Sequence, residues 1–121
     1  MGEKKEPKEA ETWPPYTMVE DRMKRIYFQF YKATYRSSGI DRKTKELIAI
    51  AASLGFKCEG CLKGHLDKAL KYGATPDEIS EAISIAMGVA AAGVVDQTDI
   101  AAKQMQIKLF DNPSVPDPDQ T

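Results

Sequence analysis

The stretch ELIAIAASLGFKCEGCLKGH, residues 46–65, decides how this chain is interpreted. It contains both cysteines and the only histidine among the 121 residues, and it begins with a glutamate. Two thiols, an imidazole that titrates near neutral pH and a carboxylate can together form a reactive thiolate and cycle it through a disulfide. The candidate catalytic residues are therefore Glu46, Cys58, Cys61 and His65. The leading hypothesis is a thiol-dependent oxidoreductase.

The first half of this stretch has the pattern of an amphipathic helix. Residues 42–54 carry apolar side chains at helical spacing. Asp41 is expected to cap the start of the helix, and Gly55 is expected to close it. Glu46 lies at the flank of the apolar stripe, so we expect its carboxylate to be half-buried.

The second half predicts another helix, from near Cys58 to Tyr72, with Gly73 as its terminator. Spacings of three and four residues place Cys58, Cys61 and His65 on one narrow strip of that helix, beside its leucine face. We expect this strip to face a pocket.

The sequence on either side of the stretch is also helical in pattern. One helix is expected from Pro14-Pro15 to about Tyr35. Thr75-Pro76-Asp77-Glu78 has the pattern of a capping box that starts a further helix. Gly88 and Gly93 allow a close backbone approach or a break, before a final amphipathic segment over residues 96–109. The predicted fold is an all-α domain of about five to six helices.

Residues 82–95 form an uncharged segment that is apolar on all sides. This segment of fourteen residues is shorter than the ~20 residues that a membrane-spanning helix needs. We therefore expect the apolar surface to meet another subunit, which predicts a homo-oligomer with no membrane partner.

Composition and charge set the remaining boundaries. Residues 1–12 are charged and lack large apolar side chains, so we expect a disordered N-terminal tail there. Residues 111–121 are rich in proline and aspartate and are expected to form a C-terminal tail, which leaves a single domain over residues 13–110. The net charge of −1 favours no nucleic-acid partner. The start of the chain has no apolar run like that of a signal peptide, so a cytoplasmic location is expected. No nucleotide- or flavin-binding loop is visible, and we expect no cofactor.

The roles of the two sulfurs follow from their neighbours. Cys58 lies at an expected helix N-terminus, which favours a thiolate, and Cys61 lies one turn before His65, which can accept its proton. Either sulfur could be the thiolate. We favour Cys61 as the attacking residue and Cys58 as the resolving thiol, with Glu46 orienting His65. The same residues can reduce a hydroperoxide or exchange with a disulfide substrate, and both chemistries stay open.

Glu46, eleven intervening residues, Cys58-Glu-Gly-Cys61, three more residues and His65 form a pattern that resembles the core motif of the alkylhydroperoxidase D family. That family belongs with the carboxymuconolactone decarboxylases. The resemblance covers about residues 40–105 and implies an all-helical fold that assembles into trimers or hexamers. It also implies that Cys61 reacts with peroxide, that Cys58 is its disulfide partner, and that Glu46 and His65 relay protons through water. A protein dithiol or a lipoyl group is the reductant that the resemblance implies.

The same residues also allow other interpretations. The decarboxylases generally lack the cysteine pair, so lactone decarboxylation is the least favoured enzymatic reading. Two thiolates, an imidazole and a carboxylate could instead hold zinc in a helical interaction module, although three of these residues lie on one helix. Cys58, Cys61 and His65 could also be ordinary core residues. Lysines that flank the cluster are a common feature of a solvated helix, and they are not assigned to the site; they are Lys57, Lys63 and Lys68.

Overall fold

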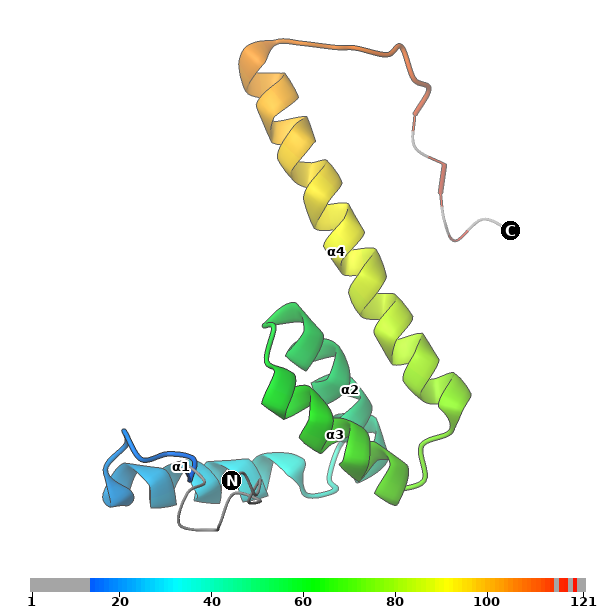
Figure 1. Cartoon of the computed structure of the whole chain (residues 1–121). Coiled ribbons are helices and arrows are strands. Elements are labelled where there is room, and N and C mark those ends of the chain that lie inside the picture. The colour runs from blue at the N-terminus through cyan, green and yellow to red at the C-terminus, as the bar shows by residue number, and fades with distance from the viewer. Residues whose placement is uncertain (1–13, 115, 118, 120–121) are drawn as a thin grey trace, which may run out of the picture. The chain divides into compact units, whose positions relative to one another are not determined.

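The computed structural model describes residues 14–114, 116–117 and 119, and this part of the chain contains helices and no strand (Figure 1). The all-α prediction is confirmed. The described residues form four helices rather than five to six: α1 (Asp21–Tyr35), α2 (Arg42–Gly55), α3 (Glu59–Lys71) and α4 (Pro76–Met105). The tail predicted for residues 1–12 lies outside the described residues.

The helix count was overestimated because α4 is continuous. Gly88 and Gly93 lie inside it, and apart from the helix's own backbone and the adjoining residues, no atom of the described residues lies within 4 Å of a Cβ placed at either glycine. No neighbouring backbone therefore requires a break there. The cost of an interior glycine, about 0.5–1 kcal/mol relative to alanine, is too small to end a helix of this length. The segment predicted over residues 96–109 is the second part of α4 and ends at Met105.

α1 begins later than predicted. Residues 15–18 form a turn, and the helix starts at Asp21. Tyr16 has a φ of 65°, which lies in the left-handed region and cannot continue a right-handed helix. The proline pair therefore lies at the start of a turn and not in the first turn of α1.

The chain divides into two compact units, residues 1–45 and residues 46–121, which are described separately. In the first unit, Lys45 Nζ donates hydrogen bonds to the carbonyl oxygens of Thr34 (2.6 Å) and Arg36 (2.7 Å), which satisfies acceptors at the C-terminal end of α1. The side chain of Asp41 accepts from the Thr44 amide at 3.3 Å, as predicted for the N-cap of α2. A hydrogen bond with the side chain of Thr44 is the main cause that lowers the pKa of the Asp41 carboxyl below its ordinary value of 3.8, and the bond from the Thr44 amide adds to it.

In the second unit, α2 and α3 lie side by side and the first turns of α4 pack against them (Figure 1). The centre of this core is Ile50, Ala69 and Ala74, which are buried. Partly buried side chains from all three helices pack around them: Leu47, Leu54, Leu62, Leu66, Ile79 and Ile83. This packing fixes α2 against α3, the two helices that carry the candidate residues.

α4 starts with the predicted capping box. The Glu78 amide donates to Thr75 Oγ1 at 3.1 Å, and the Thr75 amide donates to Glu78 Oε1 at 2.8 Å. Both bonds satisfy amides that a helix N-terminus otherwise leaves without a partner. The capping box therefore fixes the residue at which α4 begins.

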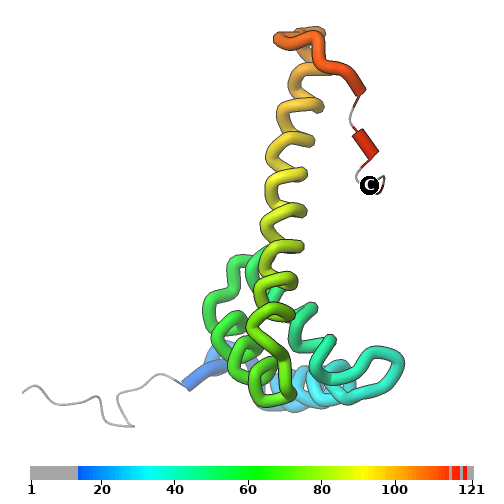
Figure 2. The backbone as a smooth tube through the Cα atoms, turned by 90° about the vertical axis from the view of Figure 1, so that its right-hand side faces the viewer, coloured from blue at the N-terminus to red at the C-terminus, as the bar shows by residue number. Residues whose placement is uncertain are grey.

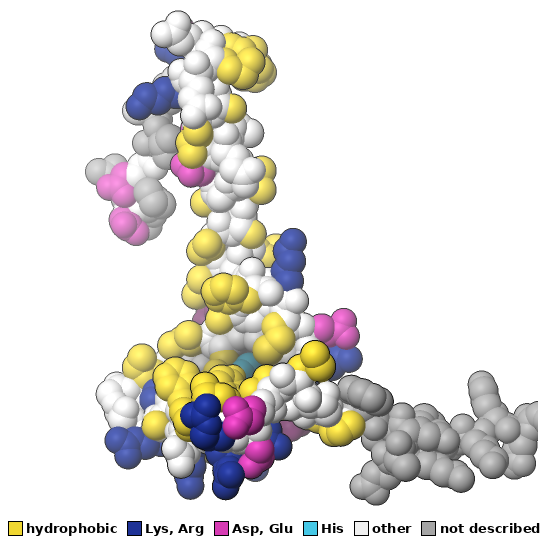
Figure 3. All heavy atoms as spheres, turned by 90° about the vertical axis from the view of Figure 1, so that its left-hand side faces the viewer, with side chains coloured by type: hydrophobic (Ala, Val, Ile, Leu, Met, Phe, Trp, Pro, Cys, Tyr) yellow, Lys and Arg dark blue, Asp and Glu magenta, His cyan; other side chains and the backbone are white. Residues whose placement is uncertain are grey.

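Beyond Ala82 no residue of α4 is buried, and the helix extends past α2 and α3 (Figure 2). Apolar side chains are visible along its length (Figure 3). Seven of them are more than half exposed: Ile85, Met87, Val89, Val94, Val95, Ile100 and Met105. Within the described part of the chain, α4 is also the one helix whose length and composition would allow it to cross a membrane.

Candidate functional site

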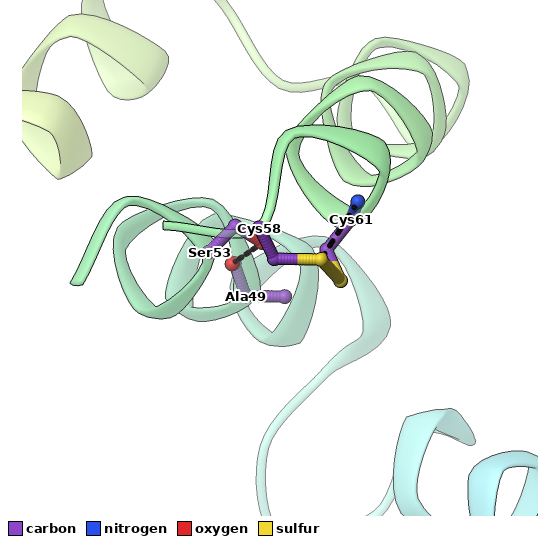
Figure 4. Close-up of a disulfide and its surroundings, with 4 residues drawn as sticks. All are labelled: Ala49, Ser53, Cys58 and Cys61. Carbon is purple, nitrogen blue, oxygen red and sulfur yellow. Dashed lines mark hydrogen bonds between the residues drawn. A yellow bond between two sulfur atoms is a disulfide. The ribbon is translucent and has the colours of Figure 1, made fainter. Parts of the chain in front are cut away.

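Cys58 and Cys61 are joined by a disulfide, with their Cα atoms 5.2 Å apart (Figure 4). The two sulfurs come from the junction of α2 with α3 and from the first turn of α3. Cys58 is half-buried, whereas Cys61 is exposed. A reactant from solvent therefore meets Cys61 more readily than Cys58.

The end of α2 fixes the backbone of Cys58. Its amide donates to the carbonyl of Ser53 at 2.9 Å, and the Lys57 amide donates to the carbonyl of Leu54 at 3.2 Å. These two bonds form a Schellman motif in which Lys57, with a φ of 56°, takes the left-handed position. The expectation that Gly55 closes α2 was wrong, because Gly55 is the last helical residue and the reversal occurs two residues later.

Cys58 is also the N-cap of α3. Its backbone is extended, and its Sγ accepts a hydrogen bond from the Cys61 amide at 3.2 Å. The start of the helix near Cys58 is as predicted, but the expected strip is not formed as described, because Cys58 precedes the helix. The sulfur instead lies where the unpaired amides of a helix N-terminus favour negative charge.

Glu46 of α2 and His65 of α3 form a buried pair. Glu46 Oε1 lies 2.7 Å from His65 Nδ1, and the two residues are 0% and 9% exposed. The carboxylate was expected to be half-buried and is instead completely enclosed. An ionised carboxylate can only accept a hydrogen bond, so with Glu46 ionised the proton of this contact lies on Nδ1, and in a neutral imidazole Nε2 is then the acceptor.

The four predicted residues thus form two contacts, one disulfide and one carboxylate–imidazole hydrogen bond. α3 connects them, because Cys61 precedes His65 by one helical turn. This arrangement places the disulfide one helical turn from an imidazole that contacts a buried carboxylate.

Ser53 is a residue of this site that the sequence analysis missed. It is buried, and its hydroxyl donates to the Ala49 carbonyl at 2.7 Å while its own carbonyl accepts from Cys58 (Figure 4). A serine in the last turns of a helix is common, so its position in the sequence gives little sign of this contact. The signal that could have identified it is its distance along the chain from Cys58. In a Schellman motif one amide donates to the carbonyl of the residue five positions earlier, and Ser53 lies five positions before Cys58.

The geometry gives no support to a zinc site. In the part of the chain that the structure describes, no three or more His, Cys, Asp or Glu side chains are grouped so that they could hold a metal ion. The thiolates that zinc would require are joined to each other in this oxidised arrangement.

Residues 21–104 match the model of the carboxymuconolactone decarboxylase family. Among curated proteins, the chain is 38% identical over 55 residues to uncharacterized protein 4 in the cox locus of Paracoccus denitrificans. That alignment covers 46% of this chain and 50% of the relative, so the chain spans about half the length of the relative that it matches.

Two solved structures are similar in fold and sequence. One is a carboxymuconolactone decarboxylase family protein of Thermotoga maritima with a suggested part in an antioxidative response; its identity is 32% and its TM-score 0.57, over 69% of this chain and 87% of that one. The other is the apo form of a family protein of Legionella pneumophila, at 29% identity and a TM-score of 0.55, over 56% of this chain and 61% of that one.

Proposed function

Because the chain belongs to the carboxymuconolactone decarboxylase family, we propose that it is a thiol-dependent oxidoreductase of the alkylhydroperoxidase type. It reduces hydroperoxides through a Cys58–Cys61 dithiol/disulfide cycle, with Glu46 and His65 as the proton relay. The suggested antioxidative part of the relative from Thermotoga maritima is in line with this proposal.

One observation carries the proposal. The buried hydrogen bond between Glu46 and His65 lies one turn along α3 from the exposed Cys61. A thiol is a weak nucleophile until it loses its proton, and a neutral imidazole held in one tautomer is a suitable acceptor. A purely structural pair would not need to lie next to the exposed sulfur of a dithiol.

In the first step, the thiol of Cys61 gives its proton to the relay, either directly or through water. The thiolate attacks the terminal oxygen of the hydroperoxide, forming the S–O bond of a sulfenic acid and breaking the O–O bond. The leaving alkoxide takes a proton and departs as an alcohol.

In the second step, the sulfur of Cys58 attacks the sulfenic sulfur of Cys61, and water leaves as the disulfide forms. A dithiol reductant, such as a protein dithiol or a lipoyl group, then exchanges with this disulfide. It becomes oxidised and returns both cysteines to thiols. The exposed Cys61 is the sulfur that such a reductant can reach.

Reduction of protein disulfides is the second candidate function. The same exposed sulfur supports it, because thiol–disulfide exchange also requires an accessible sulfur in one partner. The two functions differ in the oxidant alone. A peroxide is reduced to an alcohol, whereas a disulfide substrate is released as two thiols.

The test counts thiols and measures intact mass on the reduced protein, before and seconds after one equivalent of an organic hydroperoxide. Rapid loss of two thiols and of two mass units, absent in Cys61→Ser, is the result expected. Unreacted thiols that are lost when a disulfide substrate is added would favour the second function. Thiols that react with neither would reject both.

We also propose that the chain works as a homo-oligomer, a trimer or a hexamer. The support is the length of α4 beyond Ala82, which has no buried residue and exposes large apolar side chains. Contiguous apolar surface of this kind typically marks a contact with another protein. Another copy of α4 offers an equally apolar surface.

A further inference from the structure

Lys57 holds an unusual backbone conformation directly before the redox pair. Its φ of 56° lies in the left-handed region, which costs a residue with a Cβ more than it costs glycine. The conformation is required, because it turns the chain so that the Cys58 amide can reach the Ser53 carbonyl.

The same motif occurs three times in the described residues, which allows an internal comparison. At the end of α3 the left-handed position is Gly73, with the Ala74 amide donating to the Ala69 carbonyl at 2.9 Å. At the end of α4 it is Gln106. The chain therefore uses glycine at one of these left-handed positions and residues with a Cβ at the other two. Because Gln106 adopts the left-handed conformation far from the redox pair, this backbone strain alone does not mark a functional position. The additional feature at Lys57 is its charge.

Lys57 directly precedes Cys58 and is a cation for which the described residues show no ion pair. Glu59, the next residue after Cys58, is paired with Lys63 Nζ at 3.2 Å. Glu46 of α2 is paired with His65 of α3. No ion pair of Lys57 is found within the described residues. Its positive charge and the N-terminus of α3 therefore both favour a negative charge on the Cys58 sulfur.

We propose that Lys57 tunes the redox pair by stabilising the thiolate of Cys58. This proposal rests on the dithiol cycle described above and assigns a regulator to that same site. Cys58 attacks the sulfenic acid of Cys61 as a thiolate, and it leaves as a thiolate when a reductant attacks Cys61. A more stable thiolate makes it a better leaving group and makes the disulfide easier to reduce.

The test measures the pKa of the Cys58 thiol in the Cys61→Ser variant. The backbone amide of residue 61, which donates to the Cys58 sulfur, is still present in that variant. The rate of alkylation by iodoacetamide is followed against pH, which gives the thiol pKa without any peroxide chemistry. Lys57→Asn removes the charge but tolerates the left-handed backbone, and Lys57→Gly removes the charge and the strain. Both should raise the pKa by roughly 0.5 unit, and so slow alkylation at pH 7 about threefold.

Three controls separate charge from backbone effects. Lys57→Arg should keep the pKa of the parent protein, and Lys71→Asn, the same charge change at the far end of α3, should not move it. Gln106→Gly should relieve similar strain without changing the thiol. High salt should reduce the effect of Lys57→Asn.

An unchanged pKa in Lys57→Asn would overturn the proposal, and so would a shift seen in Lys57→Gly alone. With both cysteines present, and at a pH above the pKa of the Cys58 thiol, the equilibrium with dithiothreitol should move about threefold toward the disulfide in Lys57→Asn. Failure of the hydroperoxide test in the parent protein would remove the peroxidase function but leave the alkylation result readable.

Discussion

Glu46 and His65 are nineteen residues apart in the chain and joined by a 2.7 Å hydrogen bond inside the α2–α3 pair. A carboxylate that is 0% exposed is costly to bury, and its hydrogen bond to the imidazole offsets part of this cost. The contact therefore links stability to chemistry, because the group that fixes the imidazole also belongs to the packed interior.

Glu46→Gln should slow peroxide-dependent disulfide formation by about a hundredfold, because the amide cannot stabilise a positive charge on the imidazole. The amide keeps the size of the carboxylate and can still hydrogen bond, so the loss of stability should be smaller than in Glu46→Ala. The latter removes the partner of His65 Nδ1 and should cost about 1–3 kcal/mol in the free energy of unfolding. Stopped-flow peroxide kinetics and urea unfolding measure the two effects. Equal rates in Glu46→Gln and the parent protein would contradict the relay.

Thr75→Ala should destabilise the protein by about 1 kcal/mol, because it removes the side chain that caps the Glu78 amide at the start of α4. Ser84→Ala is a matched control: its hydroxyl donates to the Ser80 carbonyl inside α4, where that carbonyl already has a helical partner. Chemical unfolding followed by circular dichroism gives both values. A loss in Ser84→Ala as large as that in Thr75→Ala would argue against a specific role of the cap.

Asp41 predicts a pH dependence of stability. Its folded pKa is lowered, mainly by the hydrogen bond with Thr44, so the carboxylate binds its proton less readily in the folded chain than in the unfolded chain. The stabilisation is therefore complete above the ordinary value of 3.8 and is lost as the pH falls through the lower folded value. Asp41→Asn keeps an N-cap acceptor and removes the titration. Its melting temperature should fall less than that of the parent protein between pH 5 and pH 3, as measured by calorimetry.

The sequence predicted the local features of this site better than its boundaries. The pairing of Glu46 with His65 was expected from the chemistry of a carboxylate that orients an imidazole and from the resemblance of the motif, and the caps at Asp41 and Thr75 follow from side chains that bond within three residues. Lys57 was not recognised as the position of the reversal, because lysine carries no preference for the left-handed region and Gly55 offered a stronger signal. The full burial of Glu46 depends on α3 and could not be read from α2.

The continuity of α4 was missed for a related reason. Gly88 and Gly93 are signals that are compatible with a helix or with a break, and the sequence around them does not decide between the two. The described residues show no neighbour at either glycine. α4 runs through both glycines without a break, and the consequence is a long apolar surface beyond the core.

This surface gives the last prediction. Val89 is 69% exposed, and Val89→Glu should convert an oligomer into smaller species without unfolding them, because a carboxylate cannot be buried between apolar helices without a partner. Gln104→Glu places the same charge near the end of α4, at an exposed polar position, and should leave the mass unchanged. Light scattering after size exclusion measures the mass, and circular dichroism checks the helix content. A parent protein that is monomeric at all concentrations would contradict the assembly proposal.

Flotation of that protein with lipid vesicles would assign the apolar surface of α4 to a membrane, which the length and composition of this helix permit. The acidic residues Asp96 and Asp99 make that outcome the less expected one, because the uncharged part of the helix, residues 82–95, is shorter than the ~20 residues that cross a bilayer.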